Sequence, residues 1–183
     1  MERIKARSGT IGRLMVTHIG MAVFGTVLYL WTWQLGRGPA LVGGIFAALF
    51  YAAMVYVPMW ELGAKDKPAI DAGRLVDYRG DGFWIAAVAQ IPVFLLTLIY
   101  FICGLASQAA LADSIRAVCY AILVLVDGCF TGIMITLAPG GKNYPVVAAV
   151  FFAAVLYVIA VSGVSYLLGT KEFRLFPKKN DKT

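Results

Sequence analysis

Charged side chains are scarce in this 183-residue sequence: they make up 14% of it, whereas a soluble domain carries about a quarter. They are also clustered at the two ends and in one internal segment, which leaves several uncharged stretches of roughly 20 residues or more. Hydrophobic residues account for 61% of the chain. A soluble core of this size could not bury so much apolar surface, so the composition predicts an all-α integral membrane protein.

Patterns typical of metal sites and of catalysis are missing as well. The chain has a single histidine, His18, and three cysteines without a C-x-x-C pair, so the sequence indicates neither a zinc site nor a disulfide framework. It also lacks nucleophile-elbow, H-E-x-x-H, Rossmann and Walker patterns. We therefore expect no cofactor, no metal and no enzymatic activity.

The net charge of +6 would suggest a nucleic-acid partner in a soluble protein. Here the basic residues flank the apolar stretches, which is the distribution that membrane insertion and anionic lipid headgroups require. The sequence therefore indicates the lipid bilayer as the partner and excludes nucleic acid. A homo-oligomer or a membrane partner protein is compatible with the same pattern.

The uncharged stretches and the turn signals between them predict five transmembrane helices in a single domain that covers residues 1–183. The expected spans are residues 14–35, 40–60, 83–105, 115–137 and 146–168, with a polar loop at 61–82 and a basic tail at 169–183. Within the loop, Asp66 and Pro68 predict the start of a short amphipathic helix on the membrane surface.

The distribution of lysine and arginine conflicts with an odd number of spans. Four basic residues precede the first span, four lie in the polar loop and five follow the last span, and each group favours the cytoplasmic side. Two spans separate the head from the loop, so both can lie on the cytoplasmic side, and this predicts a cytoplasmic N-terminus. Three spans separate the loop from the tail, so the loop and the tail cannot lie on the same side. Either the tail lies outside, or one of the last three apolar stretches is re-entrant or is not a span at all.

Asp127 is the most informative residue, because it lies about 18 Å into the fourth predicted span. A carboxylate near the middle of a bilayer costs about 2.5 to 3.5 kcal/mol on insertion scales. Such a residue can be a proton- or cation-responsive site that faces the interior of the bundle. It can also be a hydrogen-bonded group that holds helices together, and the sequence favours this structural interpretation.

Three polar residues are candidate partners of Asp127. Judged by depth in the membrane, Gln90 is the better partner, and His18, near Arg13, is expected to lie at the interface. Thr131, four residues after Asp127, is positioned to bond it within one helix. We therefore expect a buried polar site that centres on Asp127 and Gln90.

Small residues at helical spacing predict close packing between helices. Gly128 and Gly132 form such a pair on the fourth predicted span, and Gly44 and Ala48 form another on the second. We interpret these four residues as packing surfaces rather than as parts of a binding site.

The polar loop is a candidate surface for a partner protein. Lys65, Asp66, Asp71 and Arg74 combine charges of both signs, but their spacing matches neither a calcium loop nor a phosphate-binding loop. A solvated loop is the default interpretation. Docking of a partner, or control of access to the bundle, is the alternative.

One part of the chain resembles a known group. The run from Trp60 to Asp66, followed by Gly80 and Gly82 and then by Gln90-Ile91-Pro92, is similar to a group of small multi-pass membrane proteins of Gram-positive bacteria. The resemblance covers mainly the second and third spans and their loop. It implies a bacterial plasma-membrane location and a five-span layout, and it assigns no activity and no functional residue.

Two classes of function follow from these observations. The first is an accessory, assembly or regulatory membrane component, which the absence of catalytic patterns and the packing surfaces slightly favour. The second is a small-solute or ion carrier, supported by Asp127, Gln90 and the proline after it. One buried ionisable residue is few for a solute pathway, and five spans do not divide into equal inverted halves.

Overall fold

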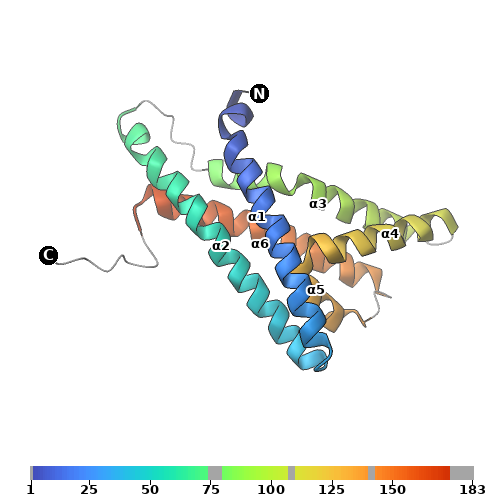
Figure 1. The fold of residues 1–183 in the computed structure, drawn as a ribbon. Coiled ribbons are helices and arrows are strands. Elements are labelled where there is room, and N and C mark those ends of the chain that lie inside the picture. The colour runs from blue at the N-terminus through green and yellow to red at the C-terminus, as the bar shows by residue number, and fades with distance from the viewer. Residues whose placement is uncertain (1, 74–79, 107–109, 140–142, 174–183) are drawn as a thin grey trace.

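The described part of the chain is helical throughout in the computed structural model, which describes residues 2–73, 80–106, 110–139 and 143–173 (Figure 1). The helices are α1 Glu2–Trp33, α2 Arg37–Asp71, α3 Asp81–Leu105, α4 Ala110–Val126, α5 Gly128–Leu137 and α6 Tyr144–Thr170. Helices α1, α2, α3 and α6 are long and apolar enough to cross a membrane. This confirms the predicted all-α class and is compatible with a multi-pass membrane protein.

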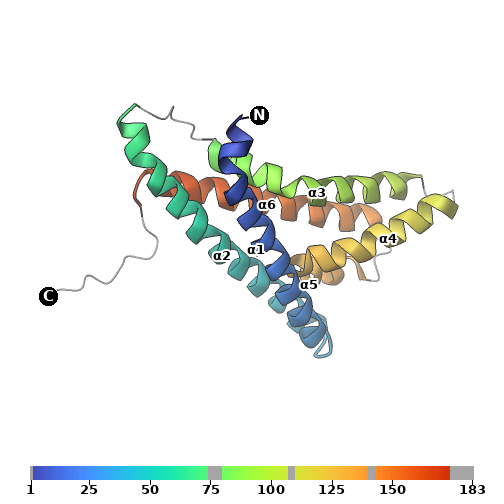
Figure 2. The same cartoon turned by 45° about the horizontal axis from the view of Figure 1, so that its top comes forward.

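One end of the bundle brings four helices together. Arg7 near the start of α1, Asp66 near the end of α2, Asp81 at the start of α3 and Tyr166 near the end of α6 are joined by ion pairs and a hydrogen bond. We call this the Arg7 end. Figures 1 and 2 show that the α1–α2 hairpin spreads apart from α3 and α6 toward the opposite end.

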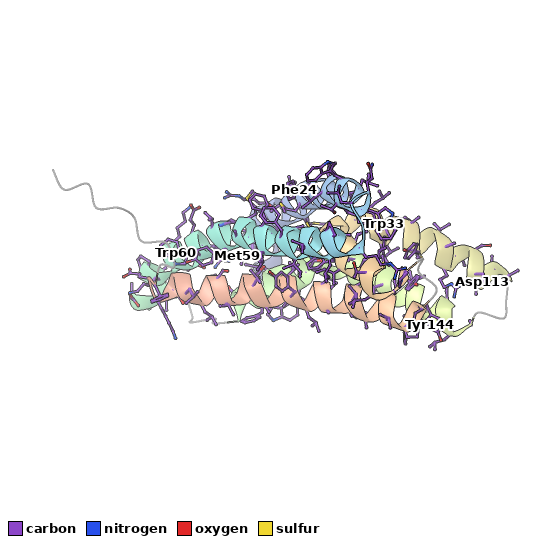
Figure 3. All side chains as sticks on the ribbon, turned by 90° about the horizontal axis from the view of Figure 1, so that it is seen from below. Phe24, Trp33, Met59, Trp60, Asp113 and Tyr144 are labelled. Atoms are coloured by element: carbon purple, nitrogen blue, oxygen red, sulfur yellow. The ribbon has the colours of Figure 1, made fainter. Side chains whose placement is uncertain are left out.

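Helices α4 and α5 occupy the space between the diverging helices. The chain enters α4 from the outer end of α3, turns at Asp127 and leaves through α5 toward the same opposite end (Figures 1 and 2). Gly132 of α5 lies against the carbonyl of Ala40, near the start of α2, so α5 runs beside that end of α2. Asp113 and Tyr144, near the starts of α4 and α6, lie at the same end of the molecule in Figure 3.

The prediction of five spanning helices is therefore wrong by one. The fourth predicted span, residues 115–137, is two shorter helices that form a V, and neither has the length of a span. The V begins and ends on one side of the molecule. Hydropathy alone could not reveal this, because a broken helix and a straight helix of equal length have the same composition.

The break at Asp127 has a local cause and a local compensation. Asp127 has φ −103° and ψ 35°, outside the helical region, and a glycine follows it. A helix that ends leaves its last carbonyls without intrahelical partners. The Thr131 hydroxyl donates to the Val124 carbonyl at 3.0 Å, and the Phe130 amide donates to the Asp127 carbonyl at 2.8 Å. These bonds stabilise the turn inside an apolar surrounding.

Large apolar side chains are exposed on the outer surface of the bundle. Figure 3 shows how the side chains project outward from the helices. On α1 this outward stripe recurs at helical spacing and consists of Val16, Ile19, Val23, Val27 and Leu30, each more than half exposed. A stripe of this size in contact with water would be unusual for a monomer. It is the surface that a lipid bilayer would cover.

Several predicted boundaries change at the Arg7 end. Helix α2 continues past residue 60 to Asp71, through Pro58 and Pro68, so the first half of the predicted loop is helix. The expected start of a separate surface helix at Asp66 is therefore wrong. The extension carries Asp66 over the end of the bundle, where α1, α3 and α6 can reach it.

Candidate functional site

Four polar side chains from separate elements meet in the interior: His18 of α1, Tyr51 of α2, Gln90 of α3 and Asp127 at the break between α4 and α5. The Tyr51 hydroxyl lies 2.8 Å from His18 Nδ1, and Gln90 Nε2 lies 3.4 Å from the same nitrogen. His18 Nε2 faces Asp127 Oδ1 at 3.6 Å. We call these four residues the buried polar site.

The buried polar site is closed to the outside. Asp127 and Tyr51 are each 2% exposed, Gln90 is 3% exposed and His18 is 8% exposed. Asp127 Oδ2, Gln90 Oε1 and His18 Nε2 have no hydrogen-bond partner among the described residues. Buried polar atoms without partners are costly, so such atoms in a native site are candidates for a role in binding.

Close packing of α1 against the break sets the geometry of the site. A Cβ atom on Gly25 would collide with the backbone of Cys129, and one on Gly128 would collide with the carbonyl of Ala22. The Cys129 thiol donates to the Met21 carbonyl at 2.9 Å. Because only glycine permits these approaches, α1 lies directly on the turn and presents His18 to Asp127.

The hydrogen bonds of the imidazole indicate where its proton lies. The amide nitrogen of Gln90 is a donor only, and His18 Nδ1 must be the acceptor of any bond with it. The Tyr51 hydroxyl at 2.8 Å then donates to the same lone pair. With this assignment of donors and acceptors, the neutral imidazole carries its proton on Nε2, which faces the Asp127 carboxyl group. A further proton on the pair can be held by either oxygen of the Asp127 carboxyl group.

The predicted ranking of partners for Asp127 needs correction. His18, which was expected at the membrane interface, faces Asp127, whereas Gln90 bonds to His18. Thr131 does not bond to the carboxyl group, because its hydroxyl donates to the backbone carbonyls of Val124 and Asp127. The ranking failed because it measured depth along a straight span that does not exist.

The predicted packing residues lie at contacts between helices. Gly128 is against α1, and Gly132 and Gly44 face each other across α5 and α2 with no room for a side chain. Ala48 is 9% exposed, and its carbonyl accepts a hydrogen bond from Tyr157 at 3.0 Å. These contacts hold α5 against α1 and α2, and they hold α2 against α6.

The charged residues of the predicted loop fall into different environments. Asp66 accepts two hydrogen bonds from Arg7, at 3.2 and 2.5 Å, and is held in the end of the bundle. Asp71 pairs with Lys67 at 2.9 Å on the helix surface, and Lys65 is exposed. Arg74 lies outside the described residues. The predicted partner loop is therefore not one continuous surface.

Two features of the structure had no signal in the sequence. Tyr51 is one aromatic residue among many in an apolar span, and only the fold places its hydroxyl against His18. The cluster of Arg7, Asp66, Asp81 and Tyr166 joins residues up to about 160 positions apart in the chain. A basic residue in the head segment predicts orientation, not a specific partner.

The described residues contain no group of three or more His, Cys, Asp and Glu side chains that could hold a metal ion. The three cysteines are free thiols. The chemistry available to the buried polar site is therefore proton exchange and hydrogen bonding by an imidazole, a carboxyl, a phenol and an amide. Comparison of the chain with protein-family models, with curated proteins and with solved structures found no match.

Proposed function

We propose that the protein is a small plasma-membrane carrier in which His18 and Asp127 take up and release a proton during transport. The observation that supports this most is the carboxyl group of Asp127, which faces an imidazole at 3.6 Å at the break of an apolar helix. The sequence alone slightly favoured an accessory role. The arrangement of the buried polar site favours the carrier.

A proton is the ligand best suited to this site. An isolated charge near the middle of a bilayer costs about 2.5 to 3.5 kcal/mol on insertion scales, so Asp127 and His18 favour states in which the pair is neutral overall. Addition or removal of one proton changes the charge of the pair by one unit. That change alters the stability of the closed arrangement, which is the property that a proton-coupled carrier needs.

The broken helix supports the same function. Irregular backbone at membrane depth is tolerated only where protein buries it or where it lines a polar cavity. In many transporters, discontinuous helices form the substrate and ion sites near the bilayer midplane. The Asp127 break lies against Ala22 and Gly25 of α1, about 22 to 27 Å along that helix from Arg7, so it occupies a similar depth. This likeness is one of architecture and names no substrate.

The arrangement of the helices also supports an orientation. With α4 and α5 returning to the side from which they start, four crossings separate the head from the tail, and the conflict between loop and tail disappears. Thirteen of the sixteen Lys and Arg residues then belong to the cytoplasmic side, and Arg37, Arg116 and Lys142 are the exceptions. We therefore propose a cytoplasmic Arg7 end.

Infrared spectroscopy of the protein in lipid tests the proton site directly. As the pH is lowered, the wild-type protein should gain a protonated-carboxyl band that is absent in Asp127→Asn. Proton uptake into proteoliposomes under an imposed membrane potential should fall to the level of empty vesicles in the same variant. Asp113→Asn is the matched control, since Asp113 is an exposed residue of α4 paired with Arg116 at 3.0 Å.

Equal proton uptake by the wild type and by Asp127→Asn would remove the main support for a carrier. The accessory or assembly role would then be the better proposal. One observation favours that second role independently: hydrogen bonds and glycine contacts link α1, α2, α3 and the break, as in a polar group that only holds helices together. Under that role, Asp127→Asn would change stability without changing proton uptake.

A further inference from the structure

The cluster of charges at the Arg7 end joins all four long helices: Asp66 of α2 bonds to α1 and α6, and Arg7 of α1 reaches α3. Asp66 accepts both guanidinium bonds of Arg7 and also the hydroxyl bond of Tyr166, at 2.9 Å. Arg7 reaches Asp81 at 3.5 Å. The side chains of Arg7, Asp66 and Asp81 are only 20%, 13% and 12% exposed. We call Arg7, Asp66, Asp81 and Tyr166 the end cluster.

The end cluster lies over the buried polar site. Arg7 precedes His18 by eleven residues on α1, and Asp81 precedes Gln90 by nine residues on α3, so the separation along these helices is about 14 to 17 Å. Both helices therefore run directly from one group of polar residues to the other. The end cluster therefore lies between this end of α1 and α3 and the level of the buried polar site.

Close packing of α2, α3 and α6 surrounds the end cluster. A Cβ atom on Gly63 or Gly82 would collide with Tyr166, and one on Gly169 would collide with the carbonyl of Trp60. Tyr166 itself is fully buried. Helices α2, α3 and α6 are thus in direct contact at this level, and the structure is closed on the Arg7 side.

We infer that the end cluster is a gate, which closes the Arg7 side of the buried polar site and opens by separation of Arg7 from Asp66. This inference rests on the proposed carrier function. Charges at the end of the bundle can regain water when the helices separate, so opening costs less here than it would in the apolar core. A single carboxylate that holds α1 and α6 to α2 also makes the opening cooperative.

Access of a thiol reagent to the space below the end cluster tests the gate. Ile85, on α3 between Asp81 and Gln90, is 4% exposed. Ile85→Cys is introduced into a variant without the three native cysteines and reacted with a membrane-impermeant methanethiosulfonate from the Arg7 side. Asp66→Asn should raise the rate of modification by about tenfold or more, equivalent to about 1.4 kcal/mol of gate opening.

Two further variants separate a gate from a general loosening of the fold. Asp71→Asn makes the same change on the same helix but breaks only the exposed pair with Lys67, so the rate should stay at its starting value. The exchange Arg7→Asp with Asp66→Arg restores an ion pair and should return the rate to slow. The gate is refuted if Asp66→Asn leaves the rate unchanged, or if the exchanged pair stays as fast as Asp66→Asn.

The same preparations distinguish failure of the gate from failure of the carrier proposal. The infrared band of Asp127 is measured alongside the rate of modification. A titrating band with an unchanged rate would refute the gate and leave the proton site standing. A raised rate that returns to slow in the exchanged pair, without a titrating band, would support the gate and refute the proton site.

Discussion

His18 and Asp127 face each other in the interior of the bundle. Their side chains are 9% and 2% exposed, and Nε2 and Oδ1 are 3.6 Å apart. A buried charge without a partner is costly, and removal of one partner from a buried ion pair typically costs about 3 to 5 kcal/mol. With one proton on the pair, both the ion pair and the two neutral groups have no net charge, so these are the states that burial favours.

Tyr51→Phe tests the hydrogen bond that fixes the imidazole. The substitution removes the hydroxyl at 2.8 Å from His18 Nδ1 and should lower the free energy of unfolding by about 1 to 3 kcal/mol, the cost of a buried polar group that loses its partner. Thermal unfolding in detergent measures the effect. Tyr120→Phe is the matched control and should cost less, because that hydroxyl has only a sulfur contact at 3.9 Å. Equal losses in the two variants would contradict the role of Tyr51.

Part of the buried polar site could be predicted at this scale. Asp127 and Gln90 were recognisable because polar residues within apolar stretches are rare and expensive. The contact between His18 and Asp127 could not be predicted, since it depends on the direction in which α4 returns. Tyr51 could not be predicted either, because a tyrosine within an apolar span is equally typical of simple packing.

Among the elements, the contact of α1 with the α4–α5 turn decides whether the site exists. Gly25 and Gly128 allow the two backbones to touch, and His18 is two turns before Gly25 on α1. A side chain at either glycine would move α1 away from the turn. The buried polar site would then lose the distance between His18 and Asp127 that its chemistry requires.

Gly25→Ala tests this contact against Gly20→Ala on the same helix. The first substitution inserts a methyl group into the Cys129 backbone and should cost about 1 to 3 kcal/mol of stability. The second meets nothing within 4 Å and should be neutral or stabilising by up to about 1 kcal/mol. Thermal unfolding of both variants in one detergent gives the comparison. A neutral result at Gly25 would show that α1 does not lie on the turn.

The elements themselves were predictable to different degrees. Apolar length identified α1, α2, α3 and α6, because a span needs about twenty apolar residues whatever its neighbours are. The break at Asp127 has only a local signal, an aspartate followed by glycine, and this pair occurs in intact helices too. The continuation of α2 to Asp71 was missed because the segment after Trp60 is charged and because Asp66 and Pro68 indicated the start of a new helix.

For the molecule as a whole, the return of α4 and α5 reconciles the charges with the fold. An odd number of spans would place the basic loop and the basic tail on opposite sides, whereas the four crossings of the proposed topology would place the head, the loop and the tail on one side. The same arrangement puts Asp127 at the tip of a V between diverging helices (Figures 1 and 2). The direction of α4 and α5 therefore decides both the topology of the chain and the surroundings of Asp127.

The most direct test compares the membrane sides of two points in the chain, with topology reporters fused after Asp71 and after Lys182. Helices α3 and α6 cross between these points, and α4 and α5 do not, so both reporters should be active on the cytoplasmic side. Reporters on opposite sides would mean that α4 and α5 together cross the membrane. Asp127 would then lie within a fifth span, and the return of α4 and α5 to the side from which they start would be contradicted.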